Sequence, residues 1–132
     1  MAQFPYFAEY NTATLPTEII ASGKYKGYDY NIKSIMGSYP TAYVKIPSTH
    51  FLFGKDYDTI DRVIPVYNMP HGGLTYGQFD DKNNFWVGWD YAHAGDYISD
   101  RFIPSKYLKK WTIEEIETEC KRLIDFLEQY ET

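Results

Sequence analysis

The most regular pattern of apolar positions lies near the C-terminus of the chain. Its apolar side chains recur at steps of three and four residues: Ile113, Ile116, Cys120, Leu123 and Leu127. This spacing places them on one face of a helix. Thr112, followed three residues later by Glu115, is a capping box that marks where such a helix begins. We therefore predict a helix over residues 113–130 that lies across a sheet, with Cys120 as a small core residue rather than a nucleophile.

Alternation of apolar and polar side chains predicts a hairpin in the first half of the chain. Residues 28–35 alternate aromatic or aliphatic side chains with polar ones, which is the period of a strand with one buried face. Residues 42–47 carry β-branched side chains at alternate places, and the Gly-Ser-Tyr-Pro segment at 37–40 is typical of a turn. We expect these two strands to pair.

Three further strands are predicted in the middle of the chain. Residues 73–79 and 85–90 predict two of them, with an Asn-Asn pair turning the chain in between. Residues 62–67 predict the third, and the proline within them restricts it to a sheet edge or a bulge.

The remaining segments are less regular. Residues 16–22 predict a short helix, with a proline in the first turn, an early acid and Gly23 in the position that favours a left-handed cap. Residues 1–14 are aromatic and irregular. Residues 48–61 predict a polar loop whose acids lack the glycine and the late Glu of a calcium loop, and we expect His50 to be hydrogen-bonded there rather than to act as a ligand.

Together these elements predict an α+β protein with a single domain over residues 1–132. We expect a mostly antiparallel sheet of four to five strands, packed against the long C-terminal helix, with the short N-terminal helix beside it. A chain of 132 residues can bury a real core without disulfides or metals.

The composition narrows the class of protein. Hydrophobic residues make up 44% of the chain and aromatics 19%, which argues against disorder. A net charge of -5 argues against binding to a nucleic acid polymer, because phosphates are neutralised by clustered Lys and Arg. The single cysteine excludes an internal disulfide, and no apolar run approaches the length of a membrane span. We expect a cytoplasmic protein that does not bind a membrane.

Two short segments concentrate the residues that carry chemistry. Residues 71–77 and 86–96 hold two of the three histidines, two of the three tryptophans and five of the nine glycines. Glycine beside a histidine or an aspartate lets the backbone approach a bound group while a hydrogen-bonding side chain stands next to it. The same glycines also suit a hairpin in which they serve geometry only. The functional interpretation gains weight because five polar side chains converge if the flanking strands pair: His71, Thr75, Asp90, His93 and Asp96.

The first hypothesis is a pocket for a small phosphorylated or nucleotide-like ligand, with no cofactor. Amides around Gly72 and Gly73 can point at an anion, and aromatic rings can stack on a base. Trp86 and Trp89 point to opposite faces of a strand, so at most one of them is such a ring. No Walker loop or dinucleotide fingerprint occurs. The predicted ligand-binding residues are Tyr43, His71, Gly72, Gly73, Thr75, Tyr76, Trp89, Asp90, His93 and Asp96.

Two other classes of function stay open. A small hydrolase would use His71, Asp90, His93 and Asp96 to bind a metal or as an acid and base pair. Asp90, His93 and Asp96 stand at steps of three and meet on one face only if their segment is helical, which Gly95 and the preceding strand disfavour. A protein-blocking inhibitor would cover a host factor with its tyrosine-rich surface. Binding without catalysis ranks first, so no catalytic residue and no metal is assigned.

Four segments also occur together and in a recognisable order: residues 42–47, residues 54–58, His-Gly-Gly-Leu-Thr at 71–75 and Trp-Asp-Tyr-Ala-His-Ala-Gly-Asp at 89–96. In these the chain resembles a family of small uncharacterised proteins encoded by phages and prophages, over about residues 28–127. Where that family is expected to carry Cys or another small residue before Ala-His, this chain has Tyr91. The difference argues against thiol chemistry at this position.

The resemblance implies a phage origin and a role against host defence. Some phage proteins of this size act as sponges, which sequester a nucleotide signal such as a cyclic ADP-ribose isomer or a cyclic oligonucleotide without cleaving it. By this analogy we expect capture of a nucleotide-like signal in the host bacterial cytoplasm. Sponges of this kind are often oligomers, so the resemblance also implies a homodimer or a higher homo-oligomer.

Overall fold

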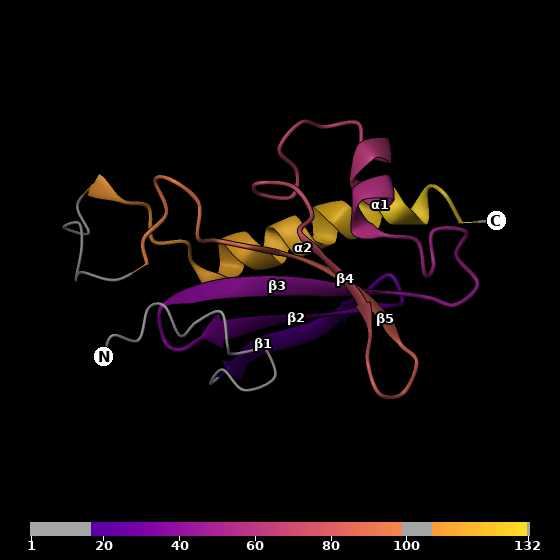
Figure 1. The fold of residues 1–132 in the computed structure, drawn as a ribbon, viewed down its shortest axis with the longest axis horizontal. Helices are drawn as coiled ribbons and strands as arrows, with labels where there is room; N and C mark the ends of the chain where they lie inside the picture. The colour runs from indigo at the N-terminus through magenta and orange to yellow at the C-terminus, as the bar shows by residue number, and fades with distance from the viewer. Residues whose placement is uncertain (1–16, 99–106, 132) are drawn as a thin grey trace, which may run out of the picture.

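The computed structural model describes residues 17–98 and 107–131 (Figure 1). The elements in chain order are β1 (Thr17–Tyr25), β2 (Tyr28–Ile35), β3 (Tyr39–Ile46), α1 (Tyr57–Val63), β4 (Tyr76–Phe79), β5 (Phe85–Asp90) and α2 (Ile113–Glu128). The strands form one antiparallel sheet in the order β1-β2-β3-β5-β4. The predicted α+β class, with an antiparallel sheet against a long C-terminal helix, is confirmed.

Helix α2 lies across one face of the sheet (Figure 1). It begins at the predicted capping box, in which Thr112 and Glu115 each accept a hydrogen bond from the other's backbone N–H. Its inner face is buried against alternate residues of the strands and contains Ile116, Cys120, Leu123, Ile124 and Leu127. Burial raises the pKa of the Cys120 thiol to about 12, so its predicted core role is confirmed. Within the described ranges, no helix is long and apolar enough to cross a membrane.

The short helix predicted at residues 16–22 is wrong over residues 17–22, where the chain runs as strand β1. Residue 16 lies outside the described residues. Lys26 and Gly27 have φ of 51° and 86°, which is the geometry of a two-residue turn that brings Tyr25 opposite Tyr28. A helix of seven residues is unstable by itself, whereas pairing with β2 satisfies the backbone of the whole segment. The short helix of this protein is α1 instead. The irregular segment predicted at residues 1–14 lies outside the described residues.

The strand predicted at residues 62–67 is also wrong. Asp56 caps α1 by accepting a hydrogen bond from Thr59 N at 2.8 Å, and Arg62 lies in the last turn of that helix. The chain then runs irregularly from residue 64 to the start of β4. An N-cap aspartate followed by an acid in the first turn is a helix signal that outweighs the β-branched residues further on.

The other predicted strands are confirmed, with bounds that differ by a few residues. Strands β2 and β3 pair as a hairpin, and β4 pairs with β5. Asn83 has a φ of 64° in the loop that joins β4 to β5, as its turn role requires.

His50 is a buried loop residue, as predicted. Its Nδ1 accepts a hydrogen bond from Leu52 N at 3.0 Å, so Nε2 carries the proton and donates to the Leu127 carbonyl at 2.8 Å. The loop after β3 is thereby fixed to the end of α2.

Candidate functional site

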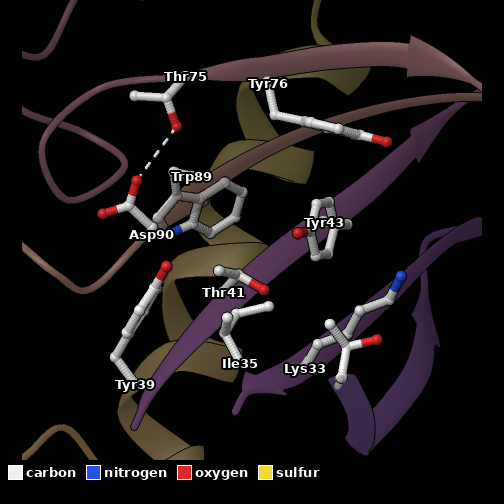
Figure 2. A pocket seen from close by; sticks show the side chains of 10 residues that line it. Lys33, Ile35, Tyr39, Thr41, Tyr43, Thr75, Tyr76, Trp89 and Asp90 are labelled. Atoms are coloured by element: carbon white, nitrogen blue, oxygen red, sulfur yellow. Dashed lines mark hydrogen bonds between the residues drawn. The ribbon is translucent and has the colours of Figure 1, made fainter. Parts of the chain in front are cut away.

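The face of the sheet that points away from α2 carries a cavity of about 430 Å³ (Figure 2). Its lining residues come from all five strands and from Thr75, which directly precedes β4: Thr17, Lys33, Ile35, Tyr39, Thr41, Tyr43, Thr75, Tyr76, Trp89 and Asp90. The volume lies at the small end of the range for ligand pockets, about 300–1,000 Å³. Five of the predicted binding residues meet here: Tyr43, Thr75, Tyr76, Trp89 and Asp90.

The register of the strands brings Lys33, Thr41 and Asp90 into one row across β2, β3 and β5. Thr41 lies between the two charged residues, and no ion pair joins Lys33 to Asp90. Thr41 is 7% exposed, and its Oγ1 has no hydrogen-bond partner among the described residues. Buried hydroxyls in folded proteins nearly always have a partner. The Thr41 hydroxyl is therefore a group that water or a ligand can satisfy.

A neighbouring row on the same face joins Tyr43, Gly88 and Tyr76. The ring of Tyr43 occupies the space that a side chain at Gly88 would need, because a Cβ there would lie 2.5 Å from Tyr43 Cδ1 and 2.8 Å from the Ala42 carbonyl oxygen. The rings of Tyr43 and Tyr76 meet edge to face with centroids 5.2 Å apart. Burial raises the pKa of Tyr43, so its hydroxyl is a hydrogen-bond donor at neutral pH.

Asp90 stands at one end of the cavity, beside Thr75 (Figure 2). Its Oδ2 accepts a long hydrogen bond from Thr75 Oγ1 at 3.4 Å, and its Oδ1 accepts one from Ala92 N at 3.1 Å. His93 Nε2 lies 3.3 Å from the same Oδ1. A carboxylate has about four acceptor positions. Asp90 therefore keeps capacity for a hydroxyl or amine of a ligand.

Lys33 stands at the other end of the cavity (Figure 2). Its Nζ lies 5.0 Å from the centroid of the Tyr43 ring. The other lysines on this face, Lys24 and Lys45, both pair with Asp29, at 3.0 Å and 2.9 Å. Among the residues that the structure describes, no carboxylate pairs with Lys33. The cavity thus contains one cation whose counter-charge is not supplied by these residues.

The loop at residues 71–74 does not present free amides to an anion. Each amide has a partner within the chain: His71 N donates to Glu119 Oε1 at 3.2 Å, Gly72 N to Asn68 Oδ1 at 2.9 Å, Gly73 N to the Pro70 carbonyl at 2.7 Å and Leu74 N to Asp61 Oδ1 at 2.9 Å. Two of these acceptors are carboxylates, which would repel an anion. The Gly72 and Gly73 amides are therefore not free to bind an anion in this conformation, and both glycines serve the turn, with φ of 76° and 82°.

His71 and Asp96 belong to a buried network and do not line the cavity. Asp96 is 5% exposed. Its carboxylate lies 2.8 Å from His71 Nε2 and accepts hydrogen bonds from Trp111 Nε1 at 3.0 Å and from His93 N at 2.9 Å. Burial alone raises the pKa of Asp96, but the hydrogen bonds from His93 N, His71 and Trp111 outweigh it and hold that pKa below its usual value.

Glu119 connects this network to α2. Its Oε1 accepts from the Tyr91 hydroxyl at 2.6 Å, and that hydroxyl accepts from Trp89 Nε1 at 2.9 Å. Trp89 is 1% exposed and packs in the core, although it also contributes to the cavity lining. Its role as a stacking surface stays a prediction. Trp86 lies on the same face of the sheet as the cavity but outside its lining, with Lys45 Nζ 5.9 Å from its ring.

His93 packs directly on the backbone of Gly72. A Cβ on Gly72 would lie 2.2 Å from His93 Nε2. The rings of His71 and His93 meet with centroids 5.3 Å apart. The predicted polar residues therefore do lie near one another, but only Thr75 and Asp90 reach the cavity. Across the described ranges, no three His, Cys, Asp or Glu side chains are placed to hold a metal ion.

Several residues of the cavity and of the buried network around Asp96 were not predicted. Lys33 occupies a polar position of the strand predicted at residues 28–35, whereas Tyr39 and Thr41 precede the strand predicted at residues 42–47, because β3 begins earlier than expected. The correct strand register places all three beside Asp90. Trp111 and Glu119 carry no local signal, because their partners are distant in sequence.

Comparison of the chain with protein-family models, with curated proteins and with solved structures gives no match. The resemblance of residues 71–75 and 89–96 to phage proteins stays a prediction.

Proposed function

We propose that this chain is a non-enzymatic binding protein that captures a small nucleotide-like or phosphorylated molecule in the cavity on the face of the sheet that points away from α2. One observation carries the proposal: the cavity combines three tyrosines with a lysine that has no carboxylate partner among the described residues and an aspartate that has free acceptor positions. A nucleotide offers a flat base to such rings, hydroxyls to the acid and a phosphate to the cation.

The state of the histidines supports capture rather than turnover. The ring of His71 is enclosed by Tyr91 and Trp111, with centroids 5.0 Å and 4.8 Å away, and its Nε2 is bound to Asp96. A general base must come within hydrogen-bond distance of the proton it removes. Of the four residues that a hydrolase would use, only Asp90 lines the cavity.

A small hydrolase is the second candidate, and the His93–Asp90 pair is the observation that favours it. His93 Nε2 is 3.3 Å from Asp90 Oδ1 and makes no hydrogen bond to any described residue. Incubation with nucleotides, followed by chromatography of the products, separates the two functions. Product formed by the wild type and lost in His93→Gln identifies an enzyme, and unchanged nucleotide supports capture.

Isothermal titration calorimetry with ribonucleosides, their phosphates and cyclic dinucleotides tests the proposed function. We expect saturable binding of at least one of these probes. Asp90→Asn and Tyr43→Ala should weaken it by about tenfold or more, because each removes a group that faces the ligand. Gln78→Ala is the matched control, since Gln78 is exposed on the same face but does not line the cavity. No binding of any probe, or equal affinity in Asp90→Asn, would overturn the proposal.

The resemblance to phage proteins supplies the biological setting that we propose, namely removal of a nucleotide signal used in host defence. Protein purified from defence-active cells should then release a small molecule on denaturation, detectable by mass spectrometry. Asp90→Asn protein should release much less of it. Recovery of a host protein instead, with equal amounts bound to wild type and Asp90→Asn, would indicate the protein-blocking alternative.

A further inference from the structure

We infer that the cavity is polarised and selects a ligand with a single anionic group, such as a nucleoside monophosphate, over a polyphosphate or a cyclic oligonucleotide. This inference rests on the proposed function and adds the orientation of the ligand. Lys33 holds the anionic group, and Asp90 accepts hydrogen bonds from hydroxyl or amine groups at the opposite end.

The first step concerns the cation. Lys33 lines the cavity, and its ammonium group has a ring of Tyr43 beside it but no carboxylate partner among the described residues. Lys24 and Lys45 are neutralised by the shared Asp29. An unpaired ammonium group in a partly enclosed site attracts an anion more strongly than a paired one on the surface. Lys33 is therefore the position in the cavity at which a phosphate is attracted most strongly.

The second step concerns the opposite end. Asp90 accepts two hydrogen bonds, one of them long, and so retains acceptor positions toward the cavity. A carboxylate accepts from hydroxyls and amines but repels a phosphate. Strand β3 keeps Asp90 and Lys33 two strand spacings apart, about 10 Å, which one nucleotide-sized molecule can bridge. The Thr41 hydroxyl lies midway and lacks a partner among the described residues, so it adds a neutral hydrogen-bonding group between the poles.

The third step concerns the number of anions. The cavity supplies one cation and one acid, so a second or third phosphate finds no additional positive charge from the lining residues. The amides of residues 71–74, which would be the alternative anion site, already have partners. The net charge of -5 adds repulsion that grows with each phosphate. Selection of a ligand with one phosphate group over a ligand with several follows from these charges.

Equilibrium dialysis with the four ribonucleosides, their 5′-monophosphates and their 5′-triphosphates tests the inference. For the base that binds, we expect the monophosphate to bind roughly tenfold more tightly than the nucleoside, the size of one charged hydrogen bond. The triphosphate should bind no more tightly than the monophosphate. Lys33→Gln should bring the ratio of the monophosphate affinity to the nucleoside affinity to about one, because the charge that holds the phosphate is gone.

Lys24→Gln is the matched control, because it removes the same charge from the same face at a lysine that is paired with Asp29. It should keep the monophosphate preference of the wild type. A preference that survives Lys33→Gln, or is lost equally in Lys24→Gln, would overturn the inference, and so would a triphosphate that binds best. Absence of binding by every probe would overturn the proposed function as well, so the two failures are distinguishable.

Discussion

The contact between Gly88 and Tyr43 makes a strand glycine necessary for the shape of the cavity. In Gly88→Ala the new Cβ would lie 2.5 Å from Tyr43 Cδ1 and 2.8 Å from the Ala42 carbonyl oxygen. The ring can move, but the carbonyl belongs to a paired strand. Overpacking of this kind costs about 1–3 kcal/mol, and the smaller unfolded-state entropy of alanine returns about 0.5–1 kcal/mol. We expect the free energy of unfolding to fall by about 1–2 kcal/mol.

Urea denaturation measures this change as a lower midpoint with an unchanged slope. A double-mutant cycle with Tyr43→Ala assigns its cause, because Gly88→Ala should cost less when the Tyr43 ring is already absent. The remaining cost would come from the Ala42 carbonyl. Equal costs in the two backgrounds, or a stabilised Gly88→Ala protein, would refute the packing of Tyr43 on Gly88.

Three further predictions concern the network behind the cavity. Gly72→Ala should lower the melting temperature more than Gly95→Ala, because both positions have positive φ but only Gly72 would also meet His93; equal losses would contradict this contact. Asp96 has a lowered pKa, so the stability it contributes is present above the usual pKa of an aspartate and is lost as the pH falls below it. In Asp96→Asn the free energy of unfolding, measured by urea denaturation, should accordingly fall less steeply than in the wild type between about pH 5 and pH 3. An equally steep fall in both proteins would contradict this role of Asp96. Glu119→Gln should cost about 1–3 kcal/mol by urea denaturation, because it removes the charge that accepts hydrogen bonds from Tyr91 and from the His71 amide; no loss would show that the network is unimportant.

Much of the fold could be predicted because its signals are local. One continuous segment contains both the apolar period of α2 and its capping box at Thr112 and Glu115. The alternation of β2 likewise lies within a single segment. Strand β1 could not be recognised in the same way, since only its pairing with β2 makes the segment extended. Helix α1 was not predicted, because the β-branched residues from Val63 onward favour a strand, although Asp56 is a good N-cap for a helix.

The candidate site was predicted only in part, because its residues come from strands whose register the sequence does not reveal. The segments around His71 and Asp90 were recognised by composition, and Thr75 does reach Asp90 as the antiparallel pairing requires. Which side chains face the cavity depends on strand register and on which amides already have partners. Neither is visible in one sequence, so Lys33 was missed and the Gly72 amide was assigned to an anion instead of to Asn68.

Titration of the ¹⁵N-labelled protein with nucleoside monophosphates, followed by amide NMR shifts, tests the central claim most directly. The account predicts that the largest shifts fall on β2, β3 and β5 around Lys33, Thr41 and Asp90, with little change at residues 71–74. Shifts centred on residues 71–74, or no shift with any nucleoside monophosphate, would contradict it.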